Sequence, residues 1–148
     1  MNDKPLFVTK LIFYTLVGIY MVLASYIIFP LPISIKRAVL PFIAILAIFF
    51  SLSGLVLIFV ALKPGIKGKL KKFLILTGGS ATGIPIIAVL HNLIYGLFLY
   101  CFGDNFWNKI GLKDEPIFFF LAIIVFQILF IIGLTGSFVM FDKDRKHV

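Results

Sequence analysis

The sequence predicts an all-α integral membrane protein, a four-helix bundle, and two observations support this fold class. Four apolar stretches, at residues 11–29, 38–62, 73–102 and 117–141, contain no Asp, Glu, Lys or Arg. Each has 19 residues or more, and about 20 apolar residues cross a ~30 Å hydrocarbon layer as a helix. The chain of 148 residues is also 61% hydrophobic and leaves only short connections between these stretches. We therefore expect a single transmembrane domain that spans residues 1–148.

The basic residues predict how the chain is oriented. If both termini lie in the cytoplasm, ten of the 14 Lys and Arg residues lie on that side and four on the other. This is the asymmetry that the positive-inside rule requires. The net charge of +8 then reflects topology, and we expect no nucleic-acid partner. The small size and the lack of organelle signals favour the plasma membrane of a prokaryote.

The first two spans are plain apolar helices with small residues in the second. The first ends at Pro30 and Pro32, which stop a helix. Its start loosely resembles a signal peptide, but the apolar run continues past the small residues to residue 29, so we expect an uncleaved span. The second span carries Ser51, Ser53 and Gly54 near its middle, where small side chains let another backbone come close.

The loop between the second and third spans is strongly basic. Lysines next to a membrane attract anionic headgroups, which makes four of them candidate lipid contacts: Lys67, Lys69, Lys71 and Lys72. Alternatively they only enforce topology.

The third span contains a cluster of small and polar residues. The candidate ligand-binding residues in it are Gly78, Gly79, Ser80, Thr82 and Gly83. One interpretation is close packing against another helix, with Gly79 and Gly83 as a GxxxG pair. The other is a broken helix, opened by Pro85, whose unwound backbone contacts a ligand. Both interpretations remain open at this point.

A histidine near the middle of the third span is the second candidate site. An ionisable group inside the membrane is a functional hypothesis by default. His91 shares a helix face with Tyr95, and Asn92 lies on the adjoining face. His91 would act as a proton carrier, as a haem or metal ligand, or as a hydrogen-bonding pin to Gln127, Ser51 or Ser53. Because the sequence holds no second histidine within a span and no metal-ligand spacing, we expect no metal and no cofactor.

The last loop and the fourth span complete the pattern. Trp107 is typical of an interfacial aromatic belt, and the acids Asp104, Asp114 and Glu115 are typical of a solvated loop face. In the fourth span Gln127 is expected to point inward. Pairs of small residues, Gly79 with Gly83 and Gly133 with Ser137, are expected to contact another helix, of this chain, of a second copy or of another membrane protein.

Two segments of the third span carry a resemblance. Residues 77–83 (TGGSATG) and 90–96 (LHNLIYG) look similar to a group of small uncharacterised four-span microbial membrane proteins. The resemblance implies a four-span fold and no particular activity.

Missing sequence motifs argue against two classes of function. The sequence has no GxSxG motif and no carboxylate inside a span, so we expect neither an enzyme nor an ion-coupled transporter. The prediction is a multi-pass membrane protein of accessory or interaction type. The alternative is an oligomeric channel or carrier for a small neutral or anionic solute that uses the polar third span.

Overall fold

The computed structural model describes residues 4–112 and 115–145, and no strand occurs among them. Three long helices, α1 (Lys4–Ile28), α2 (Ile33–Leu62) and α3 (Gly68–Phe102), precede the short helix α4 (Phe106–Lys109). The last span consists of α5 (Pro116–Phe120), a π-helical turn η1 (Leu121–Val125) and α6 (Phe126–Arg145). Four helices are long and apolar enough to cross a membrane. The predicted all-α four-helix fold is therefore confirmed, and the protein is a multi-pass membrane protein.

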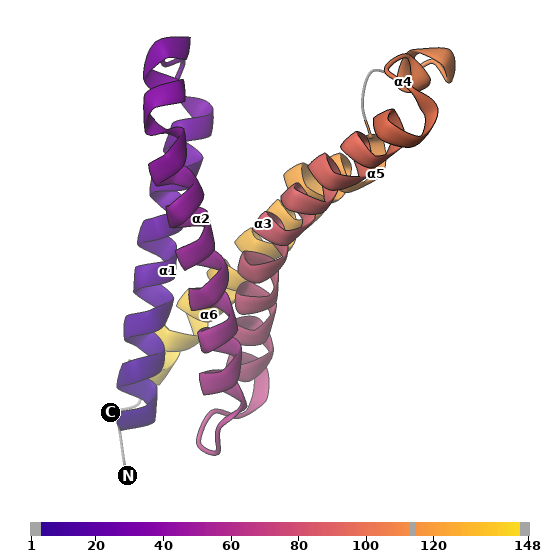
Figure 1. Cartoon of the computed structure of the whole chain (residues 1–148). Helices are drawn as coiled ribbons and strands as arrows, with labels where there is room; N and C mark the ends of the chain where they lie inside the picture. Colours follow the sequence, from indigo (N-terminus) through magenta and orange to yellow (C-terminus); the bar gives the residue numbers. More distant parts are fainter. Residues whose placement is uncertain (1–3, 113–114, 146–148) are drawn as a thin grey trace.

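The spans form two arms that meet at one end of the molecule and diverge at the other (Figure 1). One arm consists of α1 and α2, and the other consists of α3 with α5, η1 and α6. We call the end that carries the start of α1, the α2–α3 loop and the end of α6 the packed end. The end that carries the α1–α2 turn and α4 is the open end. The first and last described residues, Lys4 and Arg145, thus lie on one side of the fold, as the sequence predicts for the two termini, while the placement of this side in the cytoplasm stays a prediction.

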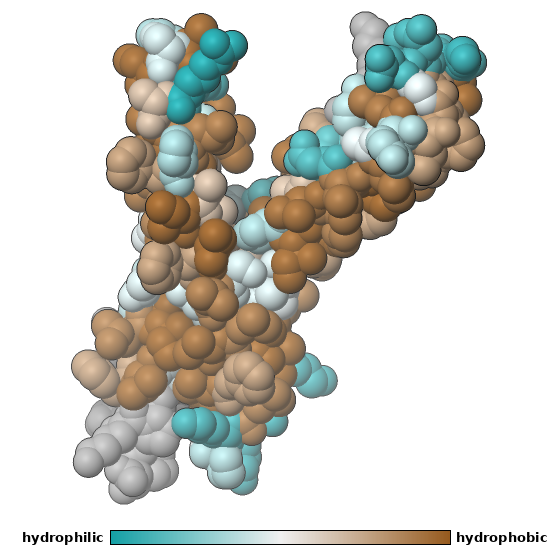
Figure 2. Space-filling view, viewed as in Figure 1, coloured by the Kyte–Doolittle hydropathy of each residue, from teal (hydrophilic) through white to brown (hydrophobic). Residues whose placement is uncertain are grey.

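Hydropathy follows this arrangement along the long axis. Apolar surface covers both arms, and hydrophilic surface gathers at the two tips of the open end and at the packed end (Figure 2). The basic loop is shorter than the sequence predicts, because α3 begins at Gly68 and takes Lys69, Lys71 and Lys72 into its first turns. The lysines therefore line the packed end.

Aromatic and branched side chains fill the packed end. Phe13, on α1, is fully buried and makes edge-on ring contacts with Phe138 and Phe141 of α6, with centroids 5.2 and 5.4 Å apart. Phe141 is also fully buried, as are Leu16, Leu57, Leu74, Phe50 and Phe130. Edge-on aromatic pairs stabilise a core beyond the area they bury. This end supplies the fixed base from which the arms diverge.

Two glycines set the crossing of α2 and α3. A Cβ atom on Gly54 would lie 2.6 Å from the carbonyl oxygen of Gly78, and a Cβ atom on Gly78 would lie 2.6 Å from the carbonyl oxygen of Gly54. Two hydroxyls reinforce the crossing: Ser51 Oγ donates to the Thr82 carbonyl at 3.3 Å, and Thr82 Oγ1 donates to the Ser51 carbonyl at 3.1 Å. The crossing is thus a backbone-to-backbone contact with polar bonds, as small residues allow in membranes.

The small residues of α3 are used for packing, and the broken-helix interpretation is wrong. α3 is helical throughout Gly68–Phe102, including Pro85. Gly83 lies against the ring of Phe126, and Gly133 would place a Cβ atom 2.6 Å from Thr77 Oγ1. These contacts join α3 to α6, as the sequence predicts. Within this chain Gly79 contacts no other helix, because a Cβ atom there would meet nothing within 4 Å, and the glycine one position earlier makes the close approach. Contact of Gly79 with a second copy or another membrane protein stays a prediction.

The irregular helix is the fourth span. Its turn Leu121–Val125 is π-helical, and such a turn accommodates one extra residue and changes which face of the helix follows. Upstream, Glu115 caps α5 by accepting hydrogen bonds from the backbone N–H groups of Ile117, at 2.7 Å, and Phe118, at 2.9 Å. The irregular backbone therefore lies in the fourth span, and the third span is a continuous helix.

Candidate functional site

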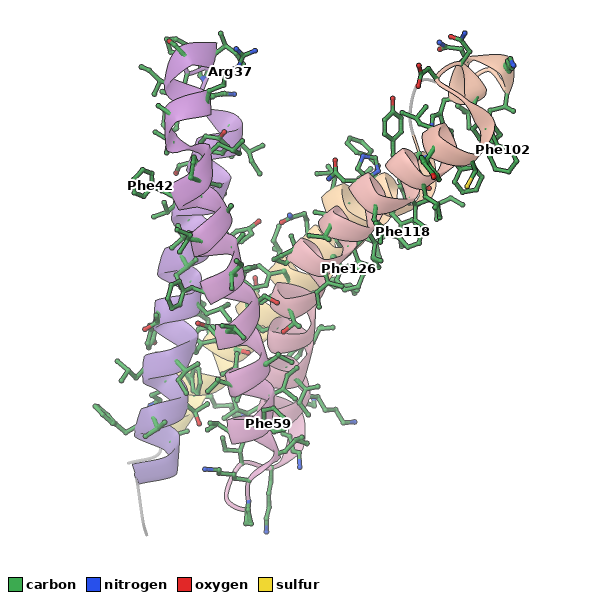
Figure 3. The ribbon with its side chains drawn as sticks, in the orientation of Figure 1. Arg37, Phe42, Phe59, Phe102, Phe118 and Phe126 are labelled. Atoms are coloured by element: carbon green, nitrogen blue, oxygen red, sulfur yellow. The ribbon has the colours of Figure 1, made fainter. Side chains whose placement is uncertain are left out.

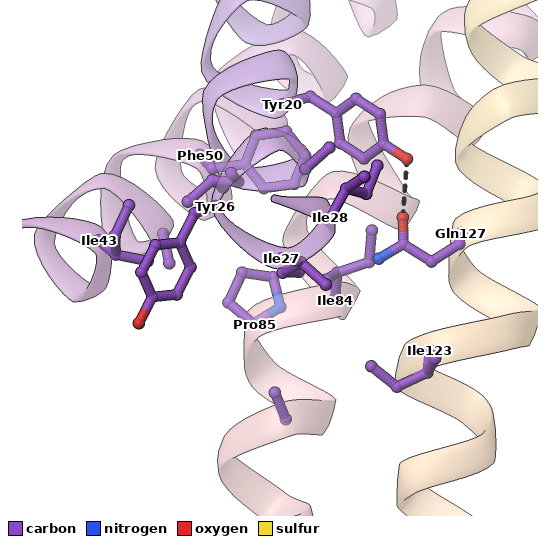
Figure 4. Close-up of a pocket in the computed structure, with 14 residues that line it drawn as sticks. Tyr20, Tyr26, Ile27, Ile28, Ile43, Phe50, Ile84, Pro85, Ile123 and Gln127 are labelled. Atoms are coloured by element: carbon purple, nitrogen blue, oxygen red, sulfur yellow. Dashed lines mark hydrogen bonds between the residues drawn. The ribbon is translucent and has the colours of Figure 1, made fainter. Parts of the chain in front are cut away.

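A cleft of about 440 Å³ lies between the arms where they begin to diverge. Its lining comes from α1, α2, α3, η1 and α6, and all of it is apolar except two tyrosines and one glutamine. Three alanines, Ala24, Ala47 and Ala88, line it from three different helices. Their small side chains leave the space that larger residues would fill. Figure 4 shows this cleft with the side chains around it.

A hydrogen bond between the arms forms the floor of the cleft. Tyr20 Oη, on α1, donates to Gln127 Oε1, on α6, over 3.0 Å (Figure 4). The Tyr20 ring packs between Phe50 and Phe130, with centroids 6.1 and 4.4 Å away. Gln127 points inward, as expected, but its partner was not predicted. Since the first span holds several tyrosines at unremarkable spacing, no signal in the sequence singles out Tyr20.

The mouth of the cleft on the α1–α2 arm is polar. Tyr26 lines the cleft, and its hydroxyl donates to the Lys36 carbonyl at 3.2 Å. Lys36 Nζ lies 6.0 Å from the centroid of the Tyr26 ring, within the range of a cation–π contact. Arg37 lies at the tip of the same arm (Figure 3). Lys36 therefore lies beside the entrance to an apolar cavity, and Arg37 follows it at the tip of the arm.

The partner of His91 is Glu115, an acid that is expected from the sequence on a solvated loop face. His91 Nδ1 lies 3.3 Å from Glu115 Oε2, and the two side chains are 14% and 4% exposed. The expectation of a solvated Glu115 is wrong, because the start of α5 packs that carboxyl against α3. Two of the suggested pins form other bonds, since Gln127 accepts from Tyr20 and Ser51 donates to the Thr82 carbonyl. A carboxylate thus lies buried directly before the fourth span.

Hydrogen bonding decides the charge state of this carboxyl. Burial alone would raise the pKa of Glu115 above its ordinary 4.5, because a buried charge loses hydration. The backbone N–H groups at the start of α5 and the His91 ring outweigh this effect and lower the pKa. Glu115 is therefore a carboxylate near neutral pH, which suits both its capping role and its contact with His91.

A smaller pocket of about 290 Å³ adjoins the cleft and contains two more predicted residues. His91 and Asn92 line it, and it shares Ala88 and Ile123 with the cleft. Asn92 is exposed, and its side-chain amide donates to the Ala88 carbonyl at 2.9 Å. The structure thus brings His91 and Asn92 to the rim of the same cavity system.

The remaining predicted site residues lie away from the cleft. Tyr95 stacks on Trp107, with ring planes 9° apart and centroids at 5.8 Å, and Trp107 is buried where a belt residue at the lipid interface was expected. Ser80 is buried at the α3 packing surface. Gly133 and Ser137 are buried within the chain. The glycine-rich cluster is therefore a packing surface, and the cavity begins directly after it, at Ile84.

Neither the comparisons with known proteins nor the described side chains assign a function or a metal ion to the chain. Among the described residues no three His, Cys, Asp or Glu side chains gather as a metal site. The chain matches no protein-family model, no curated protein and no solved structure.

Proposed function

We propose that the protein is an accessory membrane protein that acts by binding, and that its ligand is one apolar chain of a membrane lipid held in the cleft. The observation that supports this is the cleft itself. It is apolar, lies within the spans and opens between two arms. Its volume of about 440 Å³ lies within the range of about 300–1,000 Å³ that is usual for small-ligand sites.

The depth of the cleft favours a lipid chain over a partner helix. From Tyr20 at its floor to Ile28 at its mouth the helix rises ~12 Å, at about 1.5 Å per residue. That rise is a little less than half of a hydrocarbon layer of ~30 Å, or roughly one leaflet. A transmembrane helix crosses both leaflets, but below Tyr20 the four spans pack together and leave it no path between the arms. A lipid acyl chain ends at the middle of the bilayer, so the packed spans below Tyr20 do not obstruct it.

We also propose how the protein is oriented in the membrane and which membrane contains it. The lysines of the packed end would face the cytoplasm, and Lys67, Lys69, Lys71 and Lys72 would contact headgroups there. The open end and the mouth of the cleft would then lie in the opposite leaflet of the plasma membrane. This arrangement assigns no catalytic role to any residue.

An oligomeric channel or carrier is the second candidate, and the pocket of about 290 Å³ at His91 and Asn92 is the observation that favours it. Passage of a polar solute requires a continuous polar path. The pocket instead leads into an apolar cleft, so we give this function less weight. A second copy of the chain would have to supply the missing polar wall.

Filling the cleft tests the binding function. Ala47→Phe places a ring inside the cleft, whereas Ala44→Phe, on the same helix, adds the same ring at an exposed position outside it. We expect native mass spectrometry in mild detergent to detect lipid on the wild type and on Ala44→Phe, and to detect at least about tenfold less on Ala47→Phe. Equal lipid on all three would contradict the proposal, and a co-purified membrane protein in place of lipid would point to a partner helix.

A further inference from the structure

The α1–α2 arm carries positive charge only. The sequence contains no Asp or Glu between Asp3 and Asp104, so neither α1 nor α2 holds an acid. Lys36 and Arg37 are the basic residues of its tip. Neither forms an ion pair with a residue in the described part of the chain. These two cations thus face the headgroup region without a counter-ion of their own.

The tip of the other arm is different. Its described residues include two acids, Asp104 and Glu115, and one lysine, Lys109, while Lys113 and Asp114 lie outside the described residues. One of the acids, Glu115, is already bonded to His91 and to the start of α5. A negative ligand therefore meets attraction on one side of the cleft mouth and mixed charge on the other. This asymmetry gives the cleft a preferred side for an anion.

The cationic tip is connected to the wall of the cleft. Tyr26 lines the cleft, bonds the backbone of Lys36 and lies beneath its ammonium group. The aromatic contact orients the lysine stem along the wall, so its charge stays near the mouth. Because the cleft is about one leaflet deep, a chain seated on its floor brings its own headgroup to the level of Lys36.

We propose that the cleft selects an anionic phospholipid, with one acyl chain between the arms and the phosphate group beside Lys36 and Arg37. This inference rests on the proposed function and adds the class of lipid to it. The ammonium and guanidinium groups offer hydrogen-bond donors to phosphate oxygens, and a guanidinium group can bind two of them at once. A zwitterionic lipid would gain less, because its own cationic group repels the same tip.

Competition between two lipids with identical chains tests the inference. The full chain in mild detergent is mixed with phosphatidylglycerol and phosphatidylcholine, and bound lipid is counted by native mass spectrometry. We expect phosphatidylglycerol to be preferred. The double variant Lys36→Gln/Arg37→Gln should lower its affinity for phosphatidylglycerol by about thirtyfold, given the usual worth of two cations near anionic headgroups, and should leave its affinity for phosphatidylcholine unchanged.

A matched control removes the same charge from the packed end. Lys63→Gln/Lys143→Gln should keep the preference, because these lysines lie at the opposite end of the spans and are not among the proposed headgroup contacts. An equal loss in this control, or no preference in the wild type, would overturn the inference while lipid in the cleft still stands. If Ala47→Phe binds as much of both lipids as the wild type, the cleft itself is not the site and the proposed function fails.

Discussion

The packed end and the open end are built from the same four spans, yet they use their side chains differently. At the packed end Gly54 and Gly78 let two backbones touch, and phenylalanines interlock around Phe13. At the open end Gly96 has open space beside it, and large apolar side chains such as Ile28 are exposed. Lipid tails are as apolar as these side chains, so no hydrophobic force closes the arms. In a membrane, helices pack where small residues and polar bonds permit it, and lipid covers the rest.

The largest effect should come from the α2–α3 crossing. Gly78→Ala forces a Cβ atom to 2.6 Å from a backbone oxygen, so the two helices must separate. We expect the free energy of unfolding to fall by about 2 kcal/mol or more, as overpacking of a tight core does. Denaturation of the protein in mixed detergent micelles measures this quantity.

The neighbouring glycine is the matched control for that variant. Gly79→Ala adds the same atom where nothing lies within 4 Å. It should leave the free energy of unfolding unchanged or raise it by up to ~1 kcal/mol, the helix-propensity difference between glycine and alanine. If both variants lose the same stability, the close crossing of α2 and α3 does not exist.

A more local effect is expected at the open end, where Glu115 joins α5 to α3. Glu115→Ala removes the cap of α5 and the carboxylate bonded to His91. A lost cap costs about 1 kcal/mol and a broken buried charged hydrogen bond roughly 1–3 kcal/mol. We expect faster hydrogen exchange in α5 and η1, while exchange in the packed end stays as in the wild type.

The Glu115 carboxyl also makes the stability of the folded protein depend on pH. Because the folded protein lowers the pKa of Glu115, its contribution to stability is present above about pH 4.5 and is lost as the pH falls through the folded pKa. Glu115→Gln should remove the part of the acid sensitivity that comes from this group. Wild type and variant with the same loss of stability in acid would show that this carboxyl is not bonded in the folded state.

The sequence predicts the spans well and their arrangement incompletely. A stretch such as residues 38–62, free of charge and long enough to cross, can fold in a membrane only as a helix. Which of two adjacent glycines faces a neighbour depends on the rotation of α3, and hydropathy that is equal all round leaves this rotation undetermined. The π-helical turn has an ordinary sequence, LAIIV, that carries no signal of its own.

The sequence predicts the polar residues of the candidate site inside the spans but does not predict Glu115 or the cleft. His91 and Gln127 attract notice because polar groups are rare inside spans, and both prove to be paired. Glu115 was misjudged because an acid next to a proline in a loop reads as solvated, and only the return of α5 along α3 buries it. The sequence does not predict the cleft, because a closed bundle and two splayed arms have the same apolar pattern.

The most direct test of the account is a pair of distances between α2 and α3 in a lipid bilayer. One spin-label pair joins the native, exposed Cys101 to Ser34→Cys across the open end. The other joins Leu62→Cys to Lys69→Cys across the packed end, in a Cys101→Ser background. The account predicts that electron–electron resonance gives an open-end distance longer by more than one helix diameter, ~10 Å. Equal distances at the two ends would mean a closed bundle and would contradict it.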